Sequence, residues 1–480
     1  MRSSIRSGLL LAASLSTSMV EAERVVGAYI FARHGDRTAK ILGNTQLTDL
    51  GYNEVYDTGS FYNARYILSS SDKQIEGISP LIVQASQISA SSPADTVLQN
   101  SATGFLQGVY PPAGSSANQT LANSTTVVSP LSGYQLIQVT ATTSSNSNEG
   151  ATWLQGSSDC QAATVSSNNY YNSDSYNALL KSTKDFYQSL SPMLNSTFTT
   201  SQMSFKNAYS IFDYLNVAQI HNSTDEYPAL KDLTDETYAQ LLQLANNQQY
   251  NLAFNQSEPV RAIDGAVLAG EILSSLNDTI ATNGKSKLGI SFGSYGTFFS
   301  FFGLVQLPAA SVDFTGVPDY ASSMVFELVT NATGTGIPAE SELSVRFTFH
   351  NGTMTSNAEP TVYPLFGQSN DLLSWSDFKT SIEKVAVTSD AQWCDQCGNT
   401  DGKCGTSTAS TSSSDSSSLS TSSSGGMSRA VAGVIGAMVT LAVILGLQAL
   451  FFLVGGFRIS KRNKAAPEMV TSDNASAEKK

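Results

Sequence analysis

One stretch near the amino terminus decides the fold, and it reads Val25-Val26-Gly27-Ala28-Tyr29-Ile30-Phe31-Ala32-Arg33-His34-Gly35-Asp36-Arg37. Its first eight residues carry no charge and would be apolar on both faces of an extended chain, which is typical of a buried parallel strand. A histidine between two arginines follows at once, with a glycine that lets the backbone turn tightly. Ligands of open α/β sheets bind at the carboxyl ends of strands. The stretch therefore predicts a central strand that delivers these side chains to a binding site.

The residue types after this strand suit phosphate. A guanidinium fork matches phosphate oxygens with two parallel hydrogen bonds, and histidine is a competent nucleophile toward phosphorus. We expect Arg33 and Arg37 to bind phosphate and His34 to be the nucleophile if the protein is active. The alternative is a solvated charged loop behind a core strand.

The segment Arg33-His34-Gly35-Asp36-Arg37 resembles the Arg-His-Gly-x-Arg signature of the histidine acid phosphatases, a family that includes phytases and prostatic-type acid phosphatases. The resemblance implies a phosphoglycerate mutase-like α/β fold: a doubly wound, mostly parallel sheet flanked by helices, with a smaller α-helical subdomain at about 170–276. It covers residues 24–404 and extends to Leu47-Thr48-x-x-Gly51, Ser101-Ala102-x-x-Phe105, Tyr110-Pro111-Pro112, Ser323–Leu328 and Val345-Arg346-Phe347.

The chain departs from the family where the resemblance implies a second histidine and the aspartate that protonates the leaving alcohol. Tyr295 and Gly296 occupy this acid position. The family's further phosphate-binding arginine is also missing, because no Lys or Arg occurs between Lys73 and Lys181, and Val97 is the nearest counterpart. A general acid contributes about 10²–10⁴ in rate, and each preorganised donor about 10²–10³. We therefore expect hydrolysis that is hard to detect.

Few residues could replace the missing acid. The chain has three histidines, and we interpret His221 and His350 as surface or capping residues. His350 precedes Asn351-Gly352, which is typical of a hairpin turn. Asp36, at the variable position of the motif, is the remaining candidate.

Alternation of strands and helices independently favours a doubly wound sheet. Thr48 predicts the N-cap of a first helix. Leu81-Ile82-Val83 is taken as a second strand, and Leu98 and Phe105 mark the helix after it.

Both ends of the chain predict a single-pass type I membrane protein. Residues 1–22 have the pattern of a signal peptide, with two arginines, a short apolar run and a small-residue cleavage site. Residues 429–457 predict a transmembrane helix, and basic residues directly after it place the tail, 458–480, in the cytoplasm. A lipid-anchor signal is the alternative, although the polar tail argues against it.

The ectodomain, 23–404, is expected to lie outside the cell or in the lumen of a vacuole-type organelle. A Ser- and Thr-rich stalk, 405–428, separates it from the membrane. Eight Asn-x-Ser/Thr sequons in the ectodomain predict a glycosylated surface. They are Asn118, Asn123, Asn195, Asn222, Asn255, Asn277, Asn331 and Asn351.

Cysteine usage fits an oxidising compartment. Cys160, Cys394, Cys397 and Cys404 predict two disulfides, whose pairing the sequence leaves open. A zinc site is the alternative, but a lone Cys-x-x-Cys offers too few ligands. We expect no metal and no cofactor.

The formal net charge of −13 argues against nucleic acid as a partner. The expected partners are phosphate or a phosphomonoester and, through the single helix, a membrane. Three hypotheses on function remain: a pseudophosphatase that binds a phosphorylated ligand, a weakly active acid phosphomonoesterase, and a structural cell-surface glycoprotein with a vestigial pocket.

Overall fold

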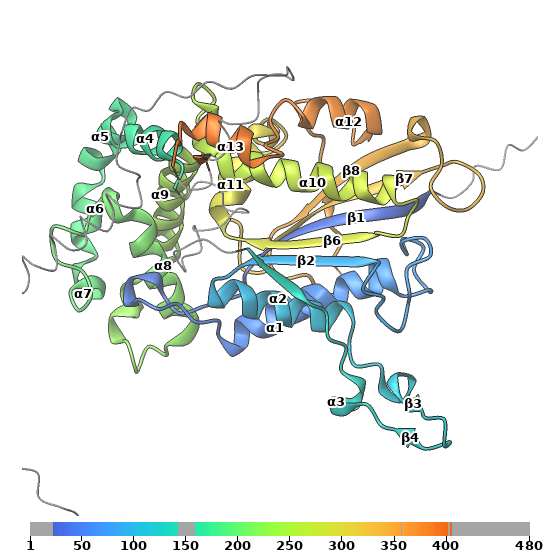
Figure 1. Cartoon of the computed structure of the whole chain (residues 1–480). Coiled ribbons are helices and arrows are strands. Elements are labelled where there is room, and N and C mark those ends of the chain that lie inside the picture. The colour runs from blue at the N-terminus through green and yellow to red at the C-terminus, as the bar shows by residue number, and fades with distance from the viewer. Residues whose placement is uncertain (1–22, 143–158, 357, 402–403, 406–480) are drawn as a thin grey trace, which may run out of the picture. The chain divides into compact units, whose positions relative to one another are not determined.

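The computed structural model describes residues 23–142, 159–356, 358–401 and 404–405, all of them within one compact unit. Its centre is an eight-stranded sheet in the order β10-β8-β7-β1-β6-β2-β5, with β9 paired to β8 (Figure 1). The strands are β1 Arg24–Arg33, β2 Ile88–Pro93, β5 Val139–Thr142, β6 Leu288–Gly293, β7 Ser323–Thr330, β8 Leu343–His350, β9 Thr361–Val362 and β10 Leu372–Ser374.

The α/β class with a helix-flanked sheet is confirmed, but the prediction of a mostly parallel sheet is wrong for half of it. Strands β1, β6, β2 and β5 run parallel. Strands β7, β8, β9 and β10 pair antiparallel with their neighbours. The connection from β7 to β8 is a short loop with one 3₁₀ turn, and antiparallel neighbours need no helical crossover.

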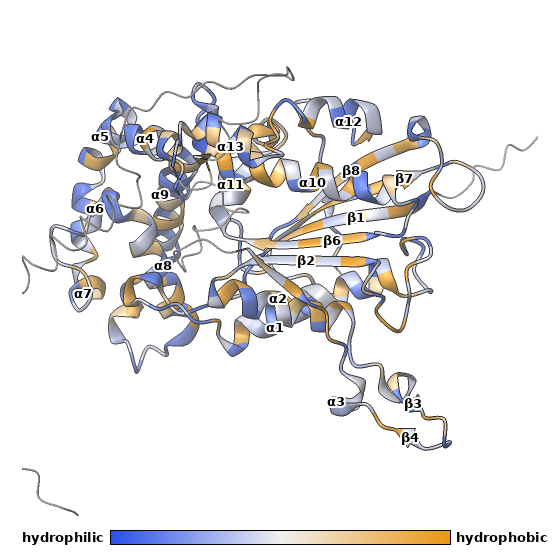
Figure 2. Ribbon diagram, viewed as in Figure 1, coloured by the Kyte–Doolittle hydropathy of each residue, from blue (hydrophilic) through white to orange (hydrophobic). Residues whose placement is uncertain are grey.

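Helices cover both faces of the sheet, as Figure 1 shows. Val26, Tyr29 and Phe31 of β1 pack with α10 and α11 on one face, whereas Ala28 and Ile30 pack with α1 and α2 on the other. Strand β1 is correspondingly apolar along much of its length (Figure 2). The helices of these layers are α1 Asp49–Tyr62, α2 Thr96–Val109, α10 Ile263–Ala281, α11 Tyr295–Leu304 and α12 Trp375–Ile382.

A second group of helices, here called the cap, lies beside the carboxyl ends of the parallel strands. It has its own aromatic-rich core. Of the region predicted as a helical subdomain, α10 packs on the sheet instead. The cap helices are α4 Gln161–Asn169, α5 Asp174–Ser182, α6 Lys184–Ser189, α7 Ser191–Leu194, α8 Ala208–His221 and α9 Asp235–Ala253.

The predicted second strand is wrong in position. Leu81-Ile82-Val83 lies in a loop, where the Gln135 side chain binds the backbone at both Leu81 and Val83. The second strand of the chain is β2 instead. Its serines lack the apolar pattern that predicts a buried strand. Ser91 Oγ lies 2.8 Å from Ser291 Oγ of β6, so this partly buried polar strand pairs a hydroxyl group across the sheet.

The cysteines form two disulfides, Cys160–Cys397 and Cys394–Cys404, so the prediction of disulfides is confirmed. Both bridges involve α13 (Asp390–Cys397). The first ties α4 of the cap to this last helix, and the second closes a short loop at the end of the described chain.

No helix within the described ranges is both long and apolar enough to cross a membrane. The predicted signal peptide, transmembrane helix and tail, and all but the first residue of the predicted stalk, lie outside those ranges.

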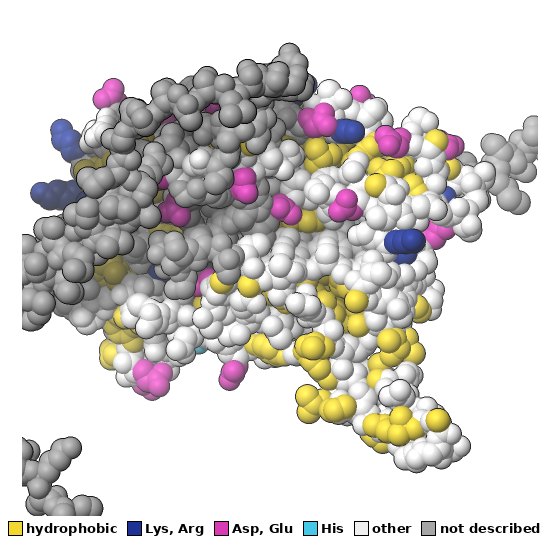
Figure 3. Space-filling model, in the orientation of Figure 1, with side chains coloured by type: hydrophobic (Ala, Val, Ile, Leu, Met, Phe, Trp, Pro, Cys, Tyr) yellow, Lys and Arg dark blue, Asp and Glu magenta, His cyan; other side chains and the backbone are white. Residues whose placement is uncertain are grey.

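Charged side chains are scattered over the described part of the face in Figure 3, while apolar side chains gather on a projecting arm. This arm contains β3 (Gln119–Thr120), β4 (Thr126–Val127) and the short helix α3 (Pro130–Gly133). The exposed apolar residues of this region are Leu121, Val127, Val128, Leu131 and Leu136.

Candidate active site

The motif follows β1 and is fully enclosed. The side chains of His34, Asp36 and Arg37 have no exposed surface, and Arg33 is 3% exposed. Gly35 is required here, because a Cβ on it would lie 2.1 Å from the carbonyl oxygen of Gly51. The first turn of α1 therefore rests directly on the motif, and both contact positions are closed to larger residues.

His34 is held in the tautomer that nucleophilic attack requires. Its Nδ1 lies 2.8 Å from the carbonyl oxygen of Gly35, and we assign the proton to Nδ1 because a carbonyl can only accept. The lone pair then belongs to Nε2. The ring has no exposed surface.

Arg37 is neutralised by the protein itself. Its Nη2 lies 3.0 Å from Oδ1 of Asp213 and its Nη1 3.3 Å from Oδ2, with side-chain exposures of 0% and 3%. Tyr209 Oη accepts a further bond at 3.3 Å, and the Thr38 carbonyl one at 3.0 Å. Asp213 also accepts the backbone N–H of Lys40 at 2.9 Å. A carboxylate from α8 thus holds the guanidinium in the two-point geometry that phosphate would use.

Arg33 is also engaged within the protein. Its Nη1 donates to the carbonyl oxygen of Pro318. Its guanidinium carbon lies 4.7 Å from the ring centroid of Tyr320 and 5.5 Å from that of Tyr295. Such cation–π contacts stabilise a desolvated cation.

The acid position lies beside the motif, because β1 and β6 are parallel neighbours with Arg33 opposite Gly293. Tyr295 begins α11 and is 9% exposed. Its ring lies 4.6 Å from that of Tyr209, and its hydroxyl donates to Gln249 at 3.1 Å. The tyrosine fills space between the cap and the motif. A Cβ at Gly296 would meet nothing closer than 3.8 Å, so sterics do not explain the missing aspartate.

The interpretation of His221 as a surface or capping residue missed a contact with the motif. His221 ends α8 and lies at the surface, with 34% of its side chain exposed, but it places Nε2 2.6 Å from Oδ2 of Asp36. The hydroxyl of Thr48, the predicted N-cap of α1, donates to the same oxygen at 2.6 Å. Asp36 therefore links the cap to the first helix, which leaves it badly placed to act as an acid.

Two other carboxyl groups near the motif have raised pKa values. Burial raises the pKa of Glu54 to about 7, although it accepts the backbone N–H of Asp36 at 2.7 Å. Burial also raises the pKa of Asp319, against the opposing charge of Arg33. Burial likewise raises the pKa of Tyr209 and of Tyr320, so both phenols stay neutral.

The remaining predicted residues lie as follows. Val97, the counterpart of the missing arginine, is fully buried on α2. His350 ends β8. Asn351 makes side-chain contacts with Asp319 and Ser322. All eight sequon asparagines are at least partly exposed.

The chain is similar to known proteins in its sequence pattern and in its fold. The family model described as histidine phosphatase superfamily (branch 2) matches residues 38–350. The apo form of Hafnia alvei phytase is 13% identical with a TM-score of 0.51, covering 78% of this chain and 98% of that one. Klebsiella sp ASR1 phytase is 12% identical with a TM-score of 0.51, covering 76% and 95%. No curated protein sequence matches the chain.

Proposed function

The chain belongs to the histidine phosphatase superfamily (branch 2), and on that premise we propose that it is a pseudophosphatase, a non-hydrolysing member whose phosphate site is closed by its own side chains. The phytases that share its fold are named for hydrolysis of a phosphorylated substrate. This chain keeps the motif of the nucleophile but not the groups that would complete the reaction.

The observation that carries the proposal is the buried pair of Arg37 and Asp213. Phosphate can reach Arg37 only if Asp213 leaves, and a carboxylate leaving this enclosed site needs a new partner or water. Two groups that would assist phosphoryl transfer are also missing. Val97 stands in place of the further arginine, and Gly296 stands in place of the acid. These losses act on separate parts of the reaction, namely binding, charge stabilisation and protonation of the leaving group.

Phosphate binding without turnover is the second candidate, and the retention of Arg33 and Arg37 beside His34 favours it. In this proposal, a phosphomonoester competes with Asp213 for Arg37. Exchange would release α8 from the motif, because Asp213 lies on that helix. Ligand binding would then loosen the cap, which is a change that a partner protein could detect.

The proposal includes a membrane-anchored, glycosylated protein with its ectodomain outside the cell or in an organelle. The charge-free segment before the basic residues at 458–464 and the exposed sequons support it. The short tail leaves any inward signal to a partner.

A turnover assay tests the main proposal. Purified full-length protein is incubated with a generic phosphomonoester near pH 5, where Glu54, with its pKa of about 7, would be protonated and best able to replace the missing acid. We expect release of phosphate at the same rate as with His34→Ala. Turnover that disappears in His34→Ala would establish the weakly active hydrolase instead.

A further inference from the structure

Three cavities meet at the carboxyl end of α9. Their volumes are about 850, 940 and 470 Å³, and Tyr250 lines all three. Phe254 lines two of them. None of the motif residues from Arg33 to Arg37 lines any of the three, so this groove needs its own explanation.

Two aromatic rings form a platform at this junction. Tyr250 and Phe254 are four residues apart on one side of the helix end, with centroids 5.9 Å apart, and both are partly exposed. Tyr250 is supported from behind by Phe299, whose ring lies edge-on at 5.7 Å. A rigid, half-exposed ring offers an apolar face to the C–H groups of a sugar ring at little entropic cost.

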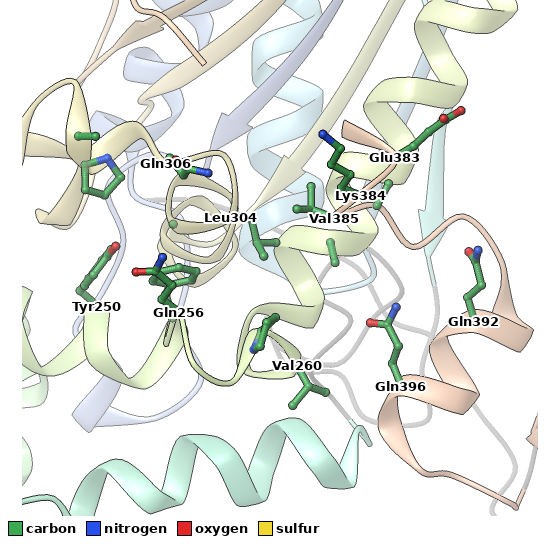
Figure 4. A pocket seen from close by; sticks show the side chains of 17 residues that line it. Tyr250, Gln256, Val260, Leu304, Gln306, Glu383, Lys384, Val385, Gln392 and Gln396 are labelled. Atoms are coloured by element: carbon green, nitrogen blue, oxygen red, sulfur yellow. The ribbon is translucent and has the colours of Figure 1, made fainter. Parts of the chain in front are cut away.

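Amide side chains surround this platform and the apolar floor next to it. Figure 4 shows Gln256 and Gln306 on one side of the first cavity and Gln396 on the other, with Leu304 and Val385 between them. Each amide is both donor and acceptor, as a sugar hydroxyl is. Within the described residues, the three glutamine side chains make no hydrogen bond to another residue, so they remain available for a ligand.

The charges of the groove argue against a phosphorylated ligand. Glu383 and Lys384 carry opposite signs side by side. Arg261 is buried and bound to Glu258 at 3.2 Å. The largest cavity adds two acidic residues, Asp313 and Asp319, and no Lys or Arg among its described lining residues, so the groove offers an anion no net positive charge. Aromatic platform, amide rim and lack of net positive charge together suit one ligand chemistry, and we propose that this groove binds uncharged carbohydrate.

Such carbohydrate has two possible sources, and one of them is the chain itself. Asn255 lines the third cavity, is partly exposed and begins the sequon Asn255-Gln256-Ser257. Its Oδ1 accepts the backbone N–H of Ser257 at 3.0 Å, which leaves Nδ2, the atom a glycan would modify, outside that bond. A glycan on Asn255 would start inside the groove. The other source is free oligosaccharide from outside.

The test uses full-length protein from a secretory host in a detergent without sugar headgroups. Calorimetry measures binding of chitin, mannan and β-glucan oligosaccharides before and after enzymatic removal of glycans, with myo-inositol hexakisphosphate as the charged probe. We expect the deglycosylated protein to bind an uncharged oligosaccharide. Tyr250→Ala should weaken that binding at least tenfold, whereas Tyr56→Ala, which alters a partly exposed tyrosine of α1, should not change it.

Tyr250→Ala also removes a contact with Phe299 and could destabilise the fold. Substitutions of the exposed glutamines at the rim of the groove therefore provide a second measurement that cannot be confused with misfolding. Gln256→Ala and Gln396→Ala should each weaken binding at least threefold. If the occupant is the chain's own glycan, the untreated protein does not bind and Asn255→Gln binds without treatment. If it is external, the untreated protein binds as well. Lack of binding by both the deglycosylated protein and Asn255→Gln, unchanged affinity in the rim variants, or tighter binding of the hexakisphosphate that Tyr250→Ala weakens would each overturn the proposal.

Discussion

The Asp213→Asn substitution tests whether Asp213 takes the place of phosphate. The amide keeps the size of the side chain and can still accept the N–H of Lys40, but it removes the carboxylate charge that is paired with Arg37. Breaking a buried ion pair on one side costs about 3–5 kcal/mol, and the exposures of 0% and 3% put this pair in that class. We therefore expect the free energy of unfolding to fall by about that amount.

Phosphate should then rescue the variant selectively. A ligand present at about 100 times its Kd stabilises the folded state by about 2.7 kcal/mol, so phosphate should restore a large part of the loss in Asp213→Asn and little in the wild type. Urea unfolding with and without phosphate measures both quantities. Glu359→Gln, an equivalent change in an 86% exposed partner of Arg65, should alter stability by less than about 0.5 kcal/mol.

Two results would refute this reasoning. One is a loss below about 1 kcal/mol in Asp213→Asn, which would mean that the pair is solvated or dispensable. The other is equal stabilisation of wild type and variant by phosphate. The double substitution Arg37→Met with Asp213→Leu separates charge from packing, because replacing both partners by apolar groups should recover most of the stability.

Other predictions concern pH, the cap contact and the long disulfide. The pKa of Glu54 is about 7 when folded and 4.5 in the reference state, so its contribution to stability is complete below pH 4.5 and is lost as the pH rises to about 7. Glu54→Gln should flatten that decline in urea unfolding curves, and an unchanged slope would contradict the assignment. His221→Ala should lower the free energy of unfolding by about 1 kcal/mol, because the bond to Asp36 is lost. His350→Ala, measured by the same urea unfolding, should leave the free energy of unfolding almost unchanged. The bridge at Cys160 closes a loop of 237 residues, so Cys160→Ser should cost about 5 kcal/mol in the chain-entropy estimate, and a loss under about 2 kcal/mol would show that the reduced chain stays organised.

The sequence predicts the elements whose signals are local. The apolar run before Arg33 is the central strand, Thr48 is the N-cap of α1, and the segment at Tyr295 lies beside the motif. Each of these follows from a pattern within about ten residues or from a family resemblance. The sequence did not reveal the serine-rich β2, because serines that pair their hydroxyls across the sheet cannot be told from surface serines in the sequence alone.

The contacts that close the site could not be predicted, because they join distant parts of the chain. Arg37 and Asp213 are 176 positions apart, and His221 is 185 positions from Asp36. The available signal was Asp213 itself, a carboxylate between Phe212 and Leu215 on a helix face that is otherwise buried. Such a residue needs a partner, but only the tertiary structure identifies which one.

The most direct test of a closed, non-hydrolysing site is to look for phosphohistidine. Wild-type protein is incubated with a phosphomonoester near pH 5, denatured in base to preserve the phosphoramidate, and the peptide containing His34 is analysed by mass spectrometry. We predict an unmodified peptide, since Asp213 forms an ion pair with Arg37 and the ring of His34 is enclosed. Phosphate on His34 would contradict the account, because attack would then proceed in spite of both.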